Sequence, residues 1–246
     1  MIEMEVCANS LRSAIAAQEG GAKRVEFCDN LAEGGTTPSY GQVALAKRML
    51  TLQVYPIIRP RGGDFLYSAI EFEIMKEDVK IFRSLGCNGI VIGMLNEDGT
   101  IDKPRCAELI RLAEGMSVAF HRAFDMTPDL LLALEDVIDL GCERVLTSGG
   151  AGSALEGAEV INRLVTAASG RISIMPGAGI NVNNIAKIIA ETGAKEFHGT
   201  AKAFVESEMK YRKGGVNMGA AVDEYRYELT DAETVKDLLE LANSAE

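Results

Sequence analysis

Residues 21–27 read Gly-Ala-Lys-Arg-Val-Glu-Phe, and variants of this stretch occur three more times along the chain. Each copy has a glycine, a small residue, one or two polar residues and then an apolar run. The other copies begin at Gly86, Gly141 and Gly193. Glycine readily adopts the left-handed conformation that ends a helix, and the apolar run fits a buried strand. Four helix-to-strand junctions in series predict alternating helices and strands, and therefore a parallel sheet.

Filling the intervals gives eight expected strands, near residues 2–7, 24–28, 53–59, 89–93, 117–121, 144–147, 172–176 and 196–199. Eight βα units in 246 residues match the size of a (β/α)₈ TIM barrel. We therefore predict an α/β fold of this kind, with residues 1–246 forming a single domain. A doubly wound open sheet is the alternative, because the order of the strands cannot be read from the sequence.

Capping residues indicate where several helices begin. Asn9 or Ser10 is expected to cap the first helix, and Thr37 and Thr127 each precede a proline that can begin a helix. A final helix near residues 232–243 would close the barrel. The segment Lys210–Asn217 is the one loop long and polar enough to act as a flap over the barrel mouth.

Composition limits the classes of function. A formal net charge of −11 argues against nucleic acid and anionic membranes as partners. The chain has no apolar stretch long enough to span a membrane, and its acidic N-terminus lacks the basic region of a signal peptide. Five cysteines, an odd number with no C-x-x-C pair, suit a reducing compartment. We expect a cytoplasmic protein.

Alternation along the expected strands identifies the side chains that face inward. The outer face of a barrel packs against helices and needs apolar residues, so Val6, Val25 and Phe27 should point outward. The alternate positions then place a set of polar and ionisable residues inside the barrel mouth: Glu5, Cys7, Glu26, Cys28, Arg59, His121 and His198.

Two interpretations of this set remain open. One is a structural network of ion pairs that fills the barrel, since buried charges require partners. The other is a catalytic site in which Glu26 and His121 exchange protons with a ligand, while His198 and Glu5 orient the substrate or bind a divalent metal.

The loops after the expected strands carry groups that suit an anionic ligand. Arginine forks, a serine hydroxyl and the backbone N–H groups of glycine turns bind carboxylate or phosphate. Asp125 would either orient His121 or pair with Arg122. For the glycines, the alternative is that they only make tight turns. The candidate anion-binding residues are Arg59, Arg61, Arg122, Asp125, Ser148, Gly149, Gly150, Gly177 and Gly179.

Cys7 and Cys28 occupy equivalent positions on the first two expected strands. Two thiolates within reach of each other suit a soft monovalent metal such as Cu(I). The alternative is a pair of small buried thiols with a packing role. Cys87, Cys106 and Cys142 are expected to be packing residues.

Six strand-end blocks, taken together and in order, resemble the CutC copper homeostasis protein family. They run from residue 4 to about residue 201 and comprise Met4–Cys7, Asn30–Gly35 with Thr37–Ser39, Ile58–Phe65, Phe120–Met126, Leu146–Gly150 and Glu196–His198. The resemblance implies a cytosolic (β/α)₈ barrel, a role in copper handling, Cys7 and Cys28 as Cu(I) ligands, and a homodimer or higher homo-oligomer. Ala178 and Gly199 depart from the family pattern.

Two hypotheses for the function follow. The first, taken from the resemblance, is binding or trafficking of Cu(I). The second is a TIM-barrel enzyme that acts on a small phosphorylated or carboxylated metabolite by general acid/base chemistry at the barrel mouth. A non-catalytic interaction protein is disfavoured, because it would not need ionisable residues at inward-facing strand positions.

Overall fold

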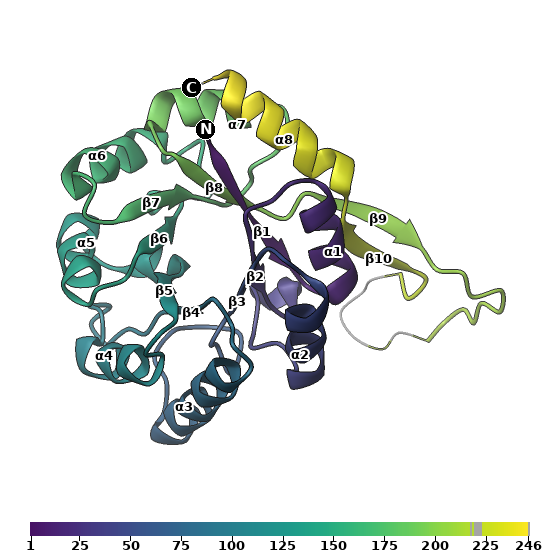
Figure 1. Cartoon of the computed structure of the whole chain (residues 1–246), viewed down its shortest axis with the longest axis horizontal. Coiled ribbons are helices and arrows are strands. Elements are labelled where there is room, and N and C mark those ends of the chain that lie inside the picture. The colour runs from purple at the N-terminus through teal and green to yellow at the C-terminus, as the bar shows by residue number, and fades with distance from the viewer. Residues whose placement is uncertain (217, 219–222, 246) are drawn as a thin grey trace.

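The computed structural model describes residues 1–216, 218 and 223–245, and its strands form a ring with helices outside it (Figure 1). The eight strands of the ring, all of them expected from the sequence, are β1 (Glu3–Ala8), β2 (Arg24–Phe27), β3 (Gln53–Pro56), β4 (Gly89–Ile92), β5 (Ser117–Phe120), β6 (Arg144–Thr147), β7 (Ser173–Pro176) and β8 (Glu196–Gly199).

Hydrogen bonding orders these parallel strands as β3-β2-β1-β8 and β4-β5-β6-β7. A bridge between Ile57 and Val91 joins β3 to β4. On the other side of the ring β7 lies beside β8, and no ladder pairs these two strands within the described residues. Because sequential strands are neighbours throughout, the predicted (β/α)₈ arrangement is confirmed and the open doubly wound sheet is excluded.

Helices connect consecutive strands on the outside of the ring (Figure 1). Ser10 caps the first of them, as expected, by accepting a hydrogen bond from the backbone N–H of Ser13. The last helix packs between the first and the seventh, and Ile2 N–H donates to Asn243 Oδ1 over 2.9 Å, which ties the two ends of the chain together. The helices are α1 (Leu11–Glu19), α2 (Tyr40–Met49), α3 (Ala69–Ser84), α4 (Lys103–Leu112), α5 (Leu130–Asp139), α6 (Ala158–Ala168), α7 (Ile185–Thr192) and α8 (Ala232–Ser244), with the 3₁₀ turns η1 (Leu31–Glu33) and η2 (Arg122–Met126).

The capping roles expected of Thr37 and Thr127 are wrong. Helix α2 is capped by Ser39 and helix α5 by Asp129, two residues further along in each case. The Thr37 hydroxyl instead accepts a hydrogen bond from the backbone N–H of Arg59 (2.9 Å), so it is used to join two loops. None of the helices in the described part of the chain is long and apolar enough to cross a membrane.

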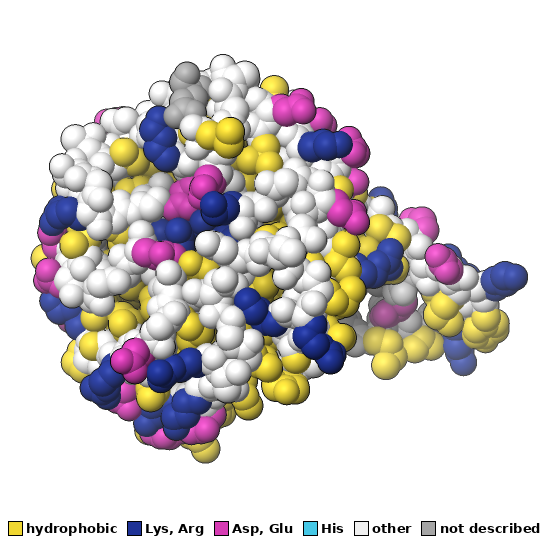
Figure 2. Space-filling model, viewed as in Figure 1, with side chains coloured by type: hydrophobic (Ala, Val, Ile, Leu, Met, Phe, Trp, Pro, Cys, Tyr) yellow, Lys and Arg dark blue, Asp and Glu magenta, His cyan; other side chains and the backbone are white. Residues whose placement is uncertain are grey.

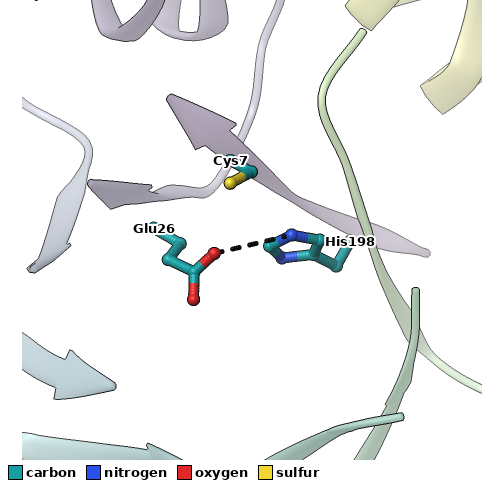
Figure 3. A group of neighbouring side chains, drawn as sticks. All are labelled: Cys7, Glu26 and His198. Carbon is teal, nitrogen blue, oxygen red and sulfur yellow. Dashed lines mark ion pairs between the residues drawn. The ribbon is translucent and has the colours of Figure 1, made fainter. Parts of the chain in front are cut away.

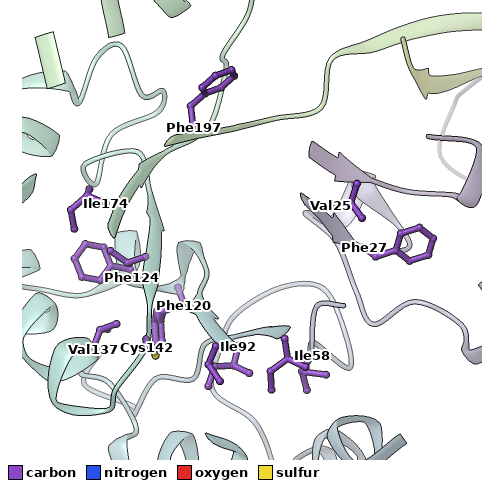
Figure 4. Packing of buried hydrophobic residues seen from close by; sticks show 14 of the residues in the cluster. Val25, Phe27, Ile58, Ile92, Phe120, Phe124, Val137, Cys142, Ile174 and Phe197 are labelled. Atoms are coloured by element: carbon purple, nitrogen blue, oxygen red, sulfur yellow. The ribbon is translucent and has the colours of Figure 1, made fainter. Parts of the chain in front are cut away.

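Alternation along the strands separates two groups of buried side chains, as the sequence predicted. Val25, Phe27, Phe120 and Phe197 point outward and are fully buried in the main core beneath the helices (Figure 4). A smaller cluster fills part of the inside of the ring and consists of Cys7, Cys28, Tyr55, Ile57, Val91 and Ala119.

A two-stranded hairpin that the sequence did not indicate projects from the ring (Figure 1). It pairs β9 (Lys202–Glu206) with β10 (Arg226–Thr230) in antiparallel register. The described residues 210–216 of the expected flap lie at the far end of this hairpin, away from the centre of the ring, and Asn217 lies outside the described residues. The described part of this segment therefore does not cover the barrel mouth.

Candidate functional site

A cavity of about 760 Å³ lies at the C-terminal ends of the strands. Its wall brings together side chains from five strand ends: Cys7, Glu26, Arg59, His121 and His198. All five residues are buried, and the most exposed of them, His198, is 8% exposed. The geometry on which both functional hypotheses depend, ionisable groups gathered at one end of the ring, is therefore present.

Beneath the cavity a chain of ion pairs runs through the ring, and it includes two residues that sequence reasoning missed, Arg24 and Arg144. Arg24 donates to Glu5 (Nε to Oε2, 2.5 Å) and to Glu196, and Arg144 donates to Glu196 (Nε to Oε1, 3.1 Å) and to Glu143. Figure 2 shows acidic and basic side chains together at the centre of the ring. Alternation would have identified both arginines, since Arg24 has the parity of Glu26.

The structural interpretation therefore holds for the deeper part of the inward-facing set, and the catalytic interpretation stays a prediction for the residues at the cavity. Arg24, Arg144 and Glu196 form the structural network, while Glu26 and His198 lie above it at the cavity. Glu5 connects the two, because its Oε2 binds Arg24 and its Oε1 lies 2.8 Å from His198 Nδ1.

Glu5 determines the state of His198. Burial by itself raises the pKa of the Glu5 carboxyl, but the charge of Arg24 and the hydrogen bond to His198 outweigh it and lower the pKa to about 2. Burial lowers the pKa of His198, but the hydrogen bond to Glu5 and the charge of Glu26 raise it above its usual value. With an ionised Glu5 as acceptor, Nδ1 carries the proton and Nε2 is directed toward Glu26, 3.6 Å from its Oε2.

Cys7, Glu26 and His198 form a compact group whose potential ligand atoms all lie within 4.8 Å of one another (Figure 3). Cys7 Sγ also lies 3.6 Å from Cys28 Sγ. The hydrogen bond to Cys28, together with burial, raises the pKa of the Cys7 thiol well above its usual value. Burial raises the pKa of Glu26 as well. A cation in this group would reverse these effects, because it favours the ionised forms of both side chains.

His121 lies on the cavity wall in a different state. Its Nδ1 accepts a hydrogen bond from the backbone N–H of Ala123 (3.1 Å), while burial and the charge of Arg59 lower its pKa to about 3. The ring is therefore neutral near pH 7 and carries its hydrogen on Nε2. Asp125, which the sequence offered as a partner for either His121 or Arg122, binds Arg122 (2.8 Å).

The loop after β6 already holds a carboxylate of the chain itself. Asp125 accepts hydrogen bonds from the backbone N–H groups of Ser148 (3.0 Å) and Gly150 (3.1 Å) and from the Thr147 hydroxyl (2.5 Å). Gly149 N–H donates to the Thr147 hydroxyl over 2.8 Å. In this loop the N–H groups that we expected to bind an external anion are thus occupied, those of Ser148 and Gly150 by Asp125 and that of Gly149 by the Thr147 hydroxyl.

Of the predicted anion-binding arginines Arg122 and Arg61, the first lines the cavity and the second does not. Arg122 lines the cavity and binds the Ser148 hydroxyl (2.8 Å). Arg61 is not among the residues that line it; its guanidinium binds Glu71 (2.6 Å) and Asp64 (2.9 Å) and holds the loop after β3.

The loop after β7 contributes backbone to the cavity. Gly179 lines it, as does Ala178, which adopts a left-handed φ of +81° that is uncommon for a residue with a Cβ. Gly177 donates its N–H to Thr147 O (2.9 Å), and a Cβ at this position would lie 2.4 Å from Leu146 Cδ1. A side chain at position 177 would therefore displace Leu146, while Gly179 lies at the cavity wall.

Comparison with known proteins is consistent across sequence and structure. Residues 2–203 match the sequence profile of the CutC family. A CutC family protein from Chromobacterium violaceum is 54% identical over 243 residues, which cover 98% of each chain. The human copper homeostasis protein cutC homolog is 47% identical over 98% of this chain and 89% of its own length.

A solved structure agrees with these relatives. The putative copper homeostasis protein CutC from Streptococcus agalactiae superposes with a TM-score of 0.78 at 38% identity, over 81% of this chain and 99% of that one.

Proposed function

The chain belongs to the CutC family of copper homeostasis proteins, and from that premise we propose that it binds Cu(I) through Cys7 and Cys28. The observation that carries the proposal is the 3.6 Å separation of the two sulfur atoms, both buried at the inner wall of the ring. Thiolates are the preferred ligands of Cu(I), and the alternative packing role does not require the sulfur atoms to face each other.

The sulfur separation also bears on the shape of the site. With metal–sulfur bonds of about 2.3 Å, a linear arrangement would place the two sulfurs about 4.6 Å apart. The two thiol sulfurs lie 3.6 Å apart, so a linear site would require them to move apart, whereas a bent site would not. A bent site has room for a third ligand, and a ring nitrogen of His198 and a Glu26 oxygen lie within 4.8 Å of Cys7 Sγ. The same mixed set suits a divalent metal such as Zn²⁺, which is the alternative occupant.

A competition titration with a Cu(I)-specific chelator tests the proposal. Cys7→Ser and Cys28→Ser should each lose tight binding, and the double variant should bind no better than background. Cys87→Ser is the matched control, because Cys87 is a buried free thiol in the main core. Retention of tight Cu(I) binding by the double variant would refute the proposal.

The cellular setting is part of the same proposal. The five cysteines are all buried and free of disulfides, as suits copper handling in the reducing cytoplasm. We also propose that the protein functions as a homo-oligomer. Sedimentation velocity of the metal-free and the copper-loaded protein measures the oligomeric state, and a monomer in both states would refute this part of the proposal.

A second candidate function is favoured by the cavity itself. Two sulfur ligands do not need about 760 Å³ of space lined by Glu26, Arg59, His121 and His198. An enzyme acting on a small anionic metabolite would use this volume, with Glu26 as one of the groups that transfer protons. His198, whose pKa is raised, suits the second role better than His121, which we expected there and whose pKa is lowered to about 3. A thermal-shift screen of anionic metabolites tests it: stabilisation that disappears in Arg59→Ala supports the enzyme, and a screen without any such compound contradicts it.

A further inference from the structure

We propose that Arg59 and His121 form a subsite for the carboxylate group of a small ligand, in which His121 acts as a neutral hydrogen-bond donor. The inference rests on the second candidate function above, since it names the ligand class for the same cavity. It assigns His121 to recognition of a ligand oxygen instead of to proton transfer.

The first support is an unsatisfied donor on His121. Its side chain is 4% exposed, its Nδ1 is occupied by the Ala123 N–H, and its Nε2 has no hydrogen-bond partner among the described residues. The Nδ1–Cε1 edge of the ring packs against Gly93, where an added Cβ would lie 2.3 Å from Cε1. The ring lines the cavity, and Nε2–H is the one ring donor left without a partner among the described residues, although the protein covers this atom in the absence of a ligand.

The second support is an unsatisfied donor on Arg59, which is also 4% exposed. Its Nη1 donates to the backbone carbonyls of Glu33 (2.6 Å) and Gly35 (2.7 Å), and its Nη2 donates to that of Gly63 (2.8 Å). Only Nε is without a partner among the described residues. Three carbonyls hold the guanidinium in place, so the orientation of Nε–H is determined before a ligand binds.

The side chains of Arg59 and His121 both pack against Phe65. The Arg59 guanidinium lies 5.1 Å from the centre of the Phe65 ring, and the His121 ring lies 5.0 Å from it on centroids. All three residues line the cavity. Buried donors without partners are uncommon in folded proteins, and two at one wall indicate that a ligand oxygen completes them.

The charge of the site points to an anion. Within the described part of the chain Arg59 forms hydrogen bonds to neutral carbonyls and no ion pair. A carboxylate supplies the negative charge and two acceptor oxygens for the two N–H groups. A phosphate is less well matched, because the backbone N–H groups of the loop after β6 that would share its third oxygen are held by Asp125.

Titrations followed by ¹⁵N NMR of the histidine side chains test the subsite on the full chain. The probes are pyruvate, oxalate and malate, with inorganic phosphate as the separate arm. Without a probe, His121 should show the neutral Nε2–H tautomer at about pH 7. At least one carboxylate should move the His121 Nε2–H resonance in a saturable way, while phosphate should leave it unchanged.

Two variants control for structural damage. His121→Phe removes the donor and keeps the ring shape, and it should weaken carboxylate binding at least about tenfold while leaving the circular dichroism spectrum and Cu(I) binding unchanged. Tyr40→Phe is the matched control, because the Tyr40 ring is exposed and Tyr40 is not among the residues that line the cavity; it should keep full carboxylate affinity.

The outcomes separate this inference from the proposed functions. If no carboxylate moves the His121 resonance while Cu(I) binding is intact, the subsite is wrong and the copper site stands. If phosphate moves it and the carboxylates do not, the ligand class is wrong, although the enzyme hypothesis stands. Equal carboxylate affinity in His121→Phe and the unmodified protein overturns the role given to His121.

Discussion

Replacing Arg24 by methionine should destabilise the protein strongly at pH 7 and much less in acid. Arg24 is 1% exposed and lies between Glu5 and Glu196, which are its partners in two buried ion pairs. Methionine keeps most of the apolar stem but removes the charge, so both carboxylates lose a buried cation that balances them.

Two routes give similar magnitudes for this loss. Removing one partner of a buried ion pair costs about 3–5 kcal/mol. Independently, the pKa of Glu5 is lowered from 4.5 to about 2 against the effect of burial, with Arg24 the largest opposing cause. At about 1.4 kcal/mol per pKa unit this corresponds to about 3 kcal/mol. We therefore expect the free energy of unfolding to fall by about 3–5 kcal/mol at pH 7.

The pH dependence follows from the direction of the pKa shift. In the unmodified protein the folded-state pKa of Glu5 lies below its unfolded value, so its stabilisation is complete above about pH 4.5 and is lost as the pH falls toward 2. In Arg24→Met the largest cause that opposes burial is lost, so the pKa of the Glu5 carboxyl rises although His198 and Arg144 still lower it. Less of the stabilisation by the ionised carboxylate then remains at neutral pH, and the difference between the two proteins shrinks as acid protonates the group in the variant.

Urea unfolding followed by circular dichroism at several pH values between about 7 and 4 measures the effect. The difference between the two proteins should be largest at pH 7 and should shrink as the pH falls. Arg171→Met is the matched control, because Arg171 binds Glu135 in an exposed ion pair and its loss should barely move the urea midpoint. Two results would refute the reasoning. One is a shift of the urea midpoint in Arg24→Met no larger than that in Arg171→Met. The other is a difference in stability between Arg24→Met and the unmodified protein that grows as the pH falls.

Three further predictions use other parts of the site. The affinity for Cu(I) should rise with pH, by up to about tenfold per pH unit for each thiol proton released on binding. The reason is that the pKa of Cys7 is raised well above its usual value, so its thiol is protonated before the metal binds. A chelator competition series from about pH 6 to 8 measures this, and an affinity that does not change with pH would contradict it. Gly93→Ala should displace the His121 ring, since the new Cβ would lie 2.3 Å from Cε1, and so weaken carboxylate binding in an NMR titration; unchanged affinity would show that the ring position is unimportant. Asp125→Asn should lower the free energy of unfolding by about 1–3 kcal/mol, because the amide cannot serve both the loop N–H groups and Arg122; a urea midpoint equal to that of the unmodified protein would argue against it.

Local patterns in the sequence were sufficient for the order of the elements and for the two faces of each strand. The glycine junctions at Gly21, Gly86, Gly141 and Gly193 lie before strands in the structure, and three of them adopt φ values between +69° and +80°. Alternation separated outward Val25 and Phe27 from inward Glu26 and Cys28. Both signals work because helix ends and strand pleats depend on neighbours only a few residues away.

Capping was predicted less well, because a hydroxyl has several competing partners. Thr37 satisfies the criteria for a helix cap, yet its hydroxyl binds the Arg59 backbone from another loop. The hairpin of β9 and β10 was missed for a different reason: its first strand, Lys202–Glu206, is mostly exposed and lacks the apolar alternation that marks a strand packed on a core, so nothing indicated a partner for Arg226–Thr230.

The state of each polar group was decided by the tertiary structure alone. Glu5 and His198 are 193 residues apart in the chain and share a hydrogen bond because β1 and β8 are neighbours in the ring. Likewise Asp125 fills the anion-binding turn at Ser148, and His121 keeps a donor without a partner among the described residues. The sequence determined which residues face the inside of the ring, because that depends on local periodicity. Which charges pair there, and which donors remain for a ligand, depends on closure of the ring, since only closure brings distant strands within hydrogen-bonding distance.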